Sequence, residues 1–225
     1  MLEVKTVRFL DNLSEQEKRI VPKVLYYEGD LKLLLEGLKV SVVGLRKVSV
    51  EGRKRAKAIT KALVERNITV VSGLAEGVDT AAHETAIGHG GKTIAVLGTP
   101  LSQAFPAKNR LLLQEIQRRH LAVSQFPDKH PVGRKNFPMR NKTMALISDA
   151  TVIVEASERS GTRHQGWECL RLGRDLFLMK NVVDNPLLTW PAEMLEYGAQ
   201  VLVKEDLDQV LDNIPNYTAG VEFAY

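Results

Sequence analysis

The sequence predicts an α/β protein with a Rossmann-like, doubly wound and mostly parallel sheet that carries helices on both faces. Two observations support this class. Short apolar runs of strand length alternate with longer segments of helical spacing. The runs are also continuous and rich in valine, as is typical of parallel strands buried on both faces. A chain of 225 residues, 44% of them hydrophobic, is long enough to bury such a core.

Three segments are expected along the chain. Residues 1–38 form an N-terminal extension that packs on the core: residues 13–19 are polar and helix-prone, and residues 22–29 are typical of extended chain. The Rossmann-like domain spans residues 39–213. Residues 214–225 contain proline and glycine and are expected to form a loose C-terminal tail.

The expected strands of the domain are seven short apolar runs. They cover residues 40–43, 69–71, 93–97, 121–124, 151–155, 176–179 and 200–203. Between them, Ile59, Leu63 and Val64 recur at about the helical period, and residues 111–116 alternate in the same way.

The charge distribution is uneven. The net charge is +4, but residues 181–225 hold one lysine and eight acidic residues, which leaves 30 cations and 19 acids in residues 1–180. The cations gather at residues 46–61 and 129–142. These cations could form a face that attracts phosphates. The alternative, for the helix-like part of the first cluster, is an ordinary solvated helix surface.

The composition also excludes several classes of site. The chain has a single cysteine, Cys169, so an internal disulfide is impossible, and its five histidines are scattered and give no metal set. No apolar run approaches the roughly 20 residues that cross a bilayer, and the N-terminus lacks a signal-peptide pattern. We therefore expect no metal, no membrane and a cytoplasmic location.

Ligands of open α/β sheets bind beyond the carboxyl ends of the strands, so the residues that follow each run are the candidate site. Glycine, hydroxyl, amide, aromatic or cationic side chains follow four of the runs. They are Arg46 and Ser49, then Ser72, Gly73 and Gly77, then Phe105, Lys108 and Asn109, and finally Ser160, Gly161 and Thr162. Glycines and helix starts offer backbone amides to an anion, and cations neutralise it.

A second segment completes the candidate site. Phe137, Arg140, Asn141 and Lys142 lie in a basic stretch that we expect to be a loop just ahead of the strand at residues 151–155. An aromatic ring, two cations and an amide suit a planar base attached to a phosphate. Three further residues are expected to support the site from within: Asp79, His83 and Glu155. The dinucleotide fingerprint and the Gly-Lys-Ser/Thr phosphate loop are both absent.

These motifs resemble the DNA-processing protein A family, also called DprA or Smf. The resemblance covers about residues 20–180 and is carried by runs in unbroken order: Val-Val-Gly-Leu-Arg at 42–46, Ser-Gly-Leu-Ala-x-Gly-Val-Asp at 72–79, Phe-Pro at 105–106, Phe-Pro-x-Arg-Asn at 137–141 and Ser-Gly at 160–161. It implies a Rossmann-like domain that binds single-stranded DNA in a basic pocket. It also implies protection of incoming DNA, loading of the RecA recombinase in natural transformation, a homodimer, and no cofactor.

Two other functions use the same type of pocket. One is a sensor of a small nucleotide signal. The other is a phosphoribohydrolase of the lonely-guy type, which cleaves a base from ribose 5-phosphate and needs a glutamate three residues after a Gly-Thr pair. Here that position is Gln165, and an amide cannot act as a general base. The sequence therefore favours a binding protein without catalysis over the hydrolase.

Overall fold

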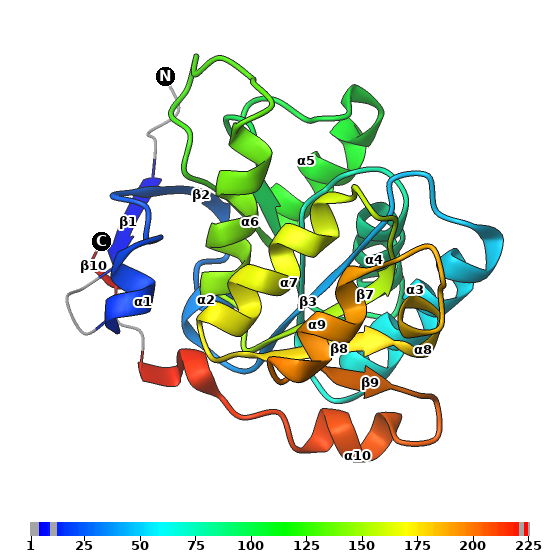
Figure 1. The fold of residues 1–225 in the computed structure, drawn as a ribbon. Coiled ribbons are helices and arrows are strands. Elements are labelled where there is room, and N and C mark those ends of the chain that lie inside the picture. The colour runs from blue at the N-terminus through cyan, green and yellow to red at the C-terminus, as the bar shows by residue number, and fades with distance from the viewer. Residues whose placement is uncertain (1–4, 10–12, 221–222, 225) are drawn as a thin grey trace.

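The described strands form one sheet, in which they lie in the order β10-β1-β2-β6-β5-β4-β3-β7-β8-β9 (Figure 1). The computed structural model describes residues 5–9, 13–220 and 223–224. The strands are β1 (Lys5–Phe9), β2 (Leu25–Gly29), β3 (Lys39–Gly44), β4 (Thr69–Ser72), β5 (Thr93–Leu97), β6 (Leu121–Ser124), β7 (Ala150–Glu155), β8 (Asp175–Met179), β9 (Gln200–Leu202) and β10 (Phe223–Ala224).

Helices connect the strands. The described α-helices are α1 (Glu15–Lys18), α2 (Lys32–Leu35), α3 (Val50–Glu65), α4 (Val78–Gly88), α5 (Arg110–Arg119), α6 (Asn136–Leu146), α7 (Gly161–Arg171), α8 (Lys180–Val183), α9 (Trp190–Glu196) and α10 (Leu207–Asp212). Two short 3₁₀ turns, η1 (Ala107–Asn109) and η2 (Tyr217–Gly220), complete the chain. None of the described helices is long and apolar enough to cross a membrane.

Seven neighbouring strands, β6 to β9 in sheet order, are parallel, and β2, β1 and β10 extend the β6 edge as antiparallel strands. The predicted α/β class with a mostly parallel sheet is confirmed. All seven predicted strands are present, with ends that differ by one residue at most. The strands β1 and β2 lie inside the expected N-terminal extension and continue the sheet of the core. The segment boundary at residue 38 stays a prediction.

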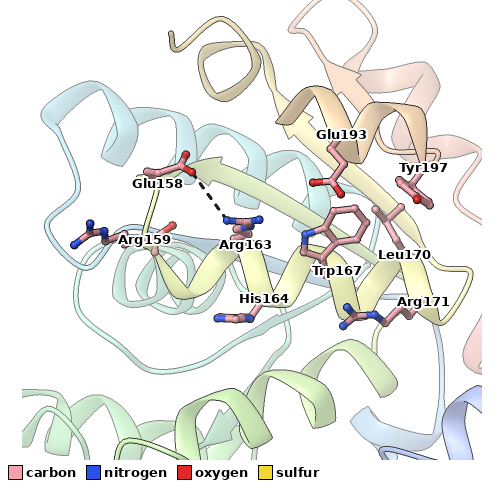
Figure 2. Close-up of a pocket in the computed structure, with 10 residues that line it drawn as sticks. Glu158, Arg159, Arg163, His164, Trp167, Leu170, Arg171, Glu193 and Tyr197 are labelled. Carbon is pink, nitrogen blue, oxygen red and sulfur yellow. Dashed lines mark ion pairs between the residues drawn. The ribbon is translucent and has the colours of Figure 1, made fainter. Parts of the chain in front are cut away.

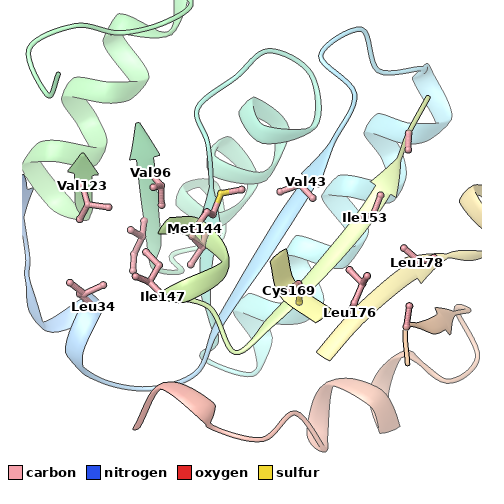
Figure 3. Close-up of a cluster of buried hydrophobic side chains, with 14 of the residues drawn as sticks. Leu34, Val43, Val96, Val123, Met144, Ile147, Ile153, Cys169, Leu176 and Leu178 are labelled. Carbon is pink, nitrogen blue, oxygen red and sulfur yellow. The ribbon is translucent and has the colours of Figure 1, made fainter. Parts of the chain in front are cut away.

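Side chains of each parallel strand point alternately to two cores, one on each face of the sheet. On β3, Val43 joins the core under α6, α7 and α9, whereas Val40 and Val42 join the core under α3, α4 and α10. Figure 3 shows the first of these cores, where Met144 of α6, Ile147 directly after it and Cys169 of α7 lie over Val43, Val96 and Ile153. Helices therefore cover both faces, as predicted.

Two local expectations are wrong. The segment that carries Phe137 to Lys142 is not a loop but the first two turns of α6, which begins at Asn136; Pro138 is tolerated there because the first turn of a helix has amides without intrahelical acceptors. The tail is also not loose from residue 214 to 220. Ile214 and Thr218 are buried, and the Thr218 amide donates to Asp149 at 2.7 Å.

Candidate nucleic-acid interface

The centre of the sheet contains a point where the direction of strand order reverses. From β3 the chain adds β4, β5 and β6 on one side, then returns to place β7, β8 and β9 on the other. The loops that leave β3 and β7 therefore diverge and leave a crevice between them, which is the usual ligand site of an open α/β sheet.

A cleft of about 430 Å³ lies at this point. Its walls come from the loop after β3, the start of α4, one face of α6, the loop after β7 and the first turns of α7. Four lining side chains are cationic (Arg46, Lys47, Arg140 and Arg159), and one is a carboxylate (Asp79). The excess of positive charge suits an anionic ligand.

The loop that carries Arg46 is fixed by the turn after β4. Gly77 has a φ of +81°, and a Cβ at this position would lie 2.1 Å from the Leu45 carbonyl oxygen and 2.4 Å from that of Arg46. The Val78 amide also donates to the Leu45 carbonyl at 3.2 Å. The glycine is thus required because the two loops pack backbone against backbone, which leaves the exposed Arg46 side chain at the rim of the cleft.

The start of α3 is anchored on β7. Ser49 accepts a hydrogen bond from the Gly52 amide at 2.9 Å, which is the usual N-cap contact. Its own amide and hydroxyl donate to the two carboxylate oxygens of Glu155, at 3.0 and 2.6 Å. Ser49 therefore uses its polar groups inside the protein, and Glu155 orients the loop between β3 and α3.

A buried ion pair lies under the cleft. The Arg140 guanidinium is 3.8 Å from the Asp79 carboxylate, and both residues are about 5% exposed. Asp79 also accepts from the amides of Gly73 and Ala75, at 3.2 and 3.3 Å. Burial raises the pKa of Asp79, and Arg140 with the two amides opposes that rise by favouring the carboxylate. Arg140 thus meets a carboxylate on one side and the cleft on the other.

Gly73 is required by this pair. A Cβ on Gly73 would lie 1.0 Å from Nη1 of Arg140, so the guanidinium occupies the space of the missing side chain. Ser72, directly before it, is fully buried, and its hydroxyl donates to the Val42 carbonyl at 2.7 Å. Ser72 and Gly73 were expected to offer a hydroxyl and amides to the ligand. Their polar groups are already bonded inside the protein, so we assign them to the frame of the site.

Aromatic rings form one wall. The Arg46 guanidinium lies 5.1 Å from the centroid of the Phe137 ring, within the range of a cation–π contact. The Phe105 ring packs against the Phe137 ring, and the two ring centroids are 5.2 Å apart. Phe137 lines the cleft, whereas Phe105 does not. Phe137 is thus the ring against which a planar group in the cleft can stack.

The first turn of α7 forms the opposite wall, and no side-chain cap bonds to its N-terminus at Ser160. Ser160, Gly161 and Thr162 all line the cleft. That this helix start offers its amides to an anion stays a prediction. Asn141 of α6 donates from its side chain to the Gly161 carbonyl at 3.2 Å, which ties the two walls together.

One more polar side chain faces the cleft. Gln165 is 1% exposed, and neither its amide oxygen nor its amide nitrogen has a hydrogen-bond partner within the described part of the chain. Buried amides are normally bonded, and this one has both of its polar atoms available to a ligand with polar groups of its own.

The structure separates the predicted residues into groups. Seven predicted ligand residues, together with Asp79, line the cleft: Arg46, Phe137, Arg140, Asn141, Ser160, Gly161 and Thr162. Ser49, Ser72, Gly73 and Gly77 hold its loops. Asn109 also belongs to the frame, because it is 5% exposed and its amide nitrogen donates to the Leu74 carbonyl and the Thr80 hydroxyl.

Two predicted cations lie elsewhere. Lys142 lines a different hollow, with residues 19–24 of the N-terminal segment, because successive residues of α6 point to different sides of the helix. Lys108 is exposed and paired with Glu76 at 3.0 Å, outside the cleft. Both were expected as ligand cations because of their sequence neighbours.

Three basic residues of the lining were not predicted as ligands: Lys47, Arg159 and His164. Lys47 and Arg159 follow strands β3 and β7, so the strand-exit rule that found Arg46 could have found them. Arg159, Ser160 and His164 also line a second hollow of about 820 Å³ between α7 and α9. Figure 2 shows this hollow, with Arg163 and Trp167 of α7 opposite Glu193 of α9 and Tyr197, which follows that helix. The two hollows thus meet at the start of α7.

Two buried groups near the sheet, the Cys169 thiol and the His83 imidazole, are poorly suited to act as a nucleophile or a general base. Burial raises the pKa of the Cys169 thiol to about 12, which keeps it protonated. Burial lowers the pKa of His83 to about 3, and its Nδ1 is hydrogen-bonded to the Thr93 hydroxyl at 2.7 Å. Within the described ranges, no three acidic, histidine or cysteine side chains are grouped so as to hold a metal ion.

Comparison with known families and proteins gives concordant results. The model of the family described as DNA recombination-mediator protein A matches residues 5–215. The DNA processing protein DprA of Streptococcus pneumoniae is 36% identical over 182 residues, which are 80% of this chain and 64% of that protein. Protein Smf of Escherichia coli is 34% identical over 194 residues, 86% of this chain and 51% of that protein. The chain thus spans between half and two thirds of these two relatives.

Solved structures agree. The X-ray structure of DprA from Streptococcus pneumoniae superposes with a TM-score of 0.83 at 32% identity, covering 96% of this chain and 76% of that one. A structure of DNA processing protein A from Helicobacter pylori, described as giving insight into its single-stranded DNA binding mode, superposes with a TM-score of 0.78 at 26% identity. The superposition covers 93% of this chain and 97% of that one.

Proposed function

Because the chain belongs to the DNA recombination-mediator protein A family, we propose that it is a DNA-processing protein that binds single-stranded DNA in the cleft between the loops after β3 and β7. The observation that carries the proposal is the composition of that cleft. Cations from three separate segments, Arg46 and Lys47, Arg140, and Arg159, meet an aromatic wall and a free helix N-terminus within one cavity.

The exposed cations supply the electrostatic part of binding. Arg46, Lys47 and Arg159 are exposed and stand at the rim, where a phosphate backbone can pass without entering the protein. Arg140 contributes differently, because it is buried and held by Asp79. A single strand suits this arrangement, since its bases are free to leave the backbone and stack on Phe137.

We propose binding without turnover. Gln165 stands where the related hydrolases carry a glutamate, and an amide neither accepts nor donates a proton in a reaction at neutral pH. Glu168 does not replace it, because its carboxylate is paired with Arg171 at 3.0 Å and does not line the cleft. Loading of RecA, a role in natural transformation, a homodimer and a cytoplasmic location stay predictions.

The test is fluorescence anisotropy with a labelled oligothymidylate and with duplex DNA. Wild type should bind the single strand, and the double variant Arg46→Ala/Arg159→Ala should lose most of that affinity. The matched control is Lys57→Ala/Lys61→Ala, which removes the same charge from α3, where both lysines line a different hollow. Equal loss in the two double variants would show that total charge, and not the cleft, governs binding.

A further inference from the structure

We infer that Gln165 is the group that holds the edge of a nucleobase, so that the cleft takes in a base of the strand as well as its phosphates. This inference rests on the proposed function of the cleft and adds a specificity-determining residue to it. Three observations support it: the missing partners of the amide, the division of charge between the rim and the interior of the cleft, and the aromatic wall.

The first observation is the chemistry of the missing partners. A primary amide presents an acceptor and a donor side by side in one plane. Both atoms of Gln165 lack a partner among the described residues, although the side chain is almost fully buried. A phosphate offers acceptors only, so it would satisfy the nitrogen and leave the oxygen unpaired. A nucleobase edge offers a donor and an acceptor next to each other, and glutamine pairs with such an edge through two hydrogen bonds.

The second observation is where the charges lie. The exposed lining cations stand at the rim, whereas the 1% exposure of Gln165 places its amide inside the cleft. Among the described residues that line the cleft, Arg140 is the only buried cation, and it already faces Asp79 at 3.8 Å. A strand that crosses the cleft can therefore keep its phosphates at the rim and turn a base inward.

The third observation is a surface on which that base can stack. The partly exposed Phe137 ring lines the same cleft, and Arg46 lies over it. A cavity of about 430 Å³ has room for a base with its sugar. Phosphates at the rim, a base against Phe137 and its edge on Gln165 form one consistent arrangement.

The experiment compares two probes of equal length and charge: an oligothymidylate about ten nucleotides long and the same backbone with abasic sugars in place of the nucleotides. Wild type should bind the oligothymidylate about tenfold more tightly than the abasic strand. Gln165→Leu and Gln165→Met should bind the two strands alike, with an unchanged dependence on salt. The melting temperature of the free protein should rise in both variants, because an unpaired buried amide has been replaced by an apolar side chain.

The control is Thr60→Val. Thr60 is fully buried in α3, its hydroxyl also has no partner in the described chain, and it does not line the cleft. Its variant should keep the preference for bases. The inference is overturned if wild type binds both strands equally, or if the Gln165 variants keep the wild-type ratio. If wild type binds neither strand, the proposed function itself fails, and the inference fails with it.

Discussion

The exposed cations of the cleft lining predict how the proposed binding of single-stranded DNA depends on salt. Arg46, Lys47 and Arg159 are exposed and free to meet a phosphate, whereas Arg140 is buried against Asp79. For single strands, the logarithm of the binding constant falls with the logarithm of salt concentration with a slope of about −0.7 per phosphate, so three contacts give a slope of about −2. Between 50 and 200 mM salt, wild type should lose about 20-fold in affinity.

Arg46→Ala should remove one contact. Its slope should fall to about −1.4, which corresponds to a loss of about 7-fold over the same range of salt. Arg46→Lys should keep the wild-type slope, because it keeps the charge, but should bind more weakly since a planar guanidinium no longer lies over Phe137. These values come from anisotropy titrations at several salt concentrations. The reasoning would be refuted if Arg46→Ala kept the wild-type slope, or if Lys57→Ala, a loss of charge outside the cleft, reduced it equally.

Three further predictions concern the frame of the site. Gly73→Ala should lower the free energy of unfolding by about 3 kcal/mol or more, because its Cβ would lie 1.0 Å from Nη1 of the buried Arg140. Gly88→Ala, where a Cβ would meet nothing within 4 Å, should change it little, and similar losses in urea titrations of the two would contradict this account. Burial lowers the His83 pKa to about 3, below its value of 6.5 in the unfolded chain. The stability that neutral His83 contributes is therefore complete above pH 6.5 and is lost as the pH falls. At pH 5 the loss in the free energy of unfolding should be about 2 kcal/mol. A His83→Asn variant should lack this part of the pH dependence, and identical profiles would show that another group causes it. Cys169, with a pKa of about 12, should react with a disulfide reagent only in denaturant, and rapid labelling of the native protein would contradict its burial.

The strand pattern was predictable because burial on both faces leaves a clear mark in the sequence. Runs such as residues 93–97 and 121–124 match the strands residue for residue. The strand-exit rule also found Arg46 and residues 160–162, because parallel strands deliver their following loops to one edge of the sheet. The sequence pattern did not place Phe137 to Lys142 in a helix, because a proline followed by polar residues is equally typical of a loop.

The direction of each side chain was outside the reach of the sequence. Arg140 and Lys142 are two residues apart, yet one lies under the cleft and the other lines a different hollow, because α6 turns by about 100° per residue. Ser72 and Ser160 each stand directly before a glycine near the carboxyl end of a strand, but of the two only Ser160 lines the cleft. Whether a polar group is free for a ligand depends on the partners that the fold supplies, as the Val42 carbonyl does for Ser72.

The sequence by itself determined the α/β class, the order of strands along the chain and the edge of the sheet at which the cleft lies, because these follow from local periodicity and from the direction of parallel strands. Only the tertiary structure decided which cations share a cavity, that Arg140 is paired with Asp79 beneath it, and that Gln165 faces it without a partner. Those properties depend on contacts between segments that lie far apart in the chain, such as residues 46, 79, 140 and 165, and no local pattern encodes such contacts.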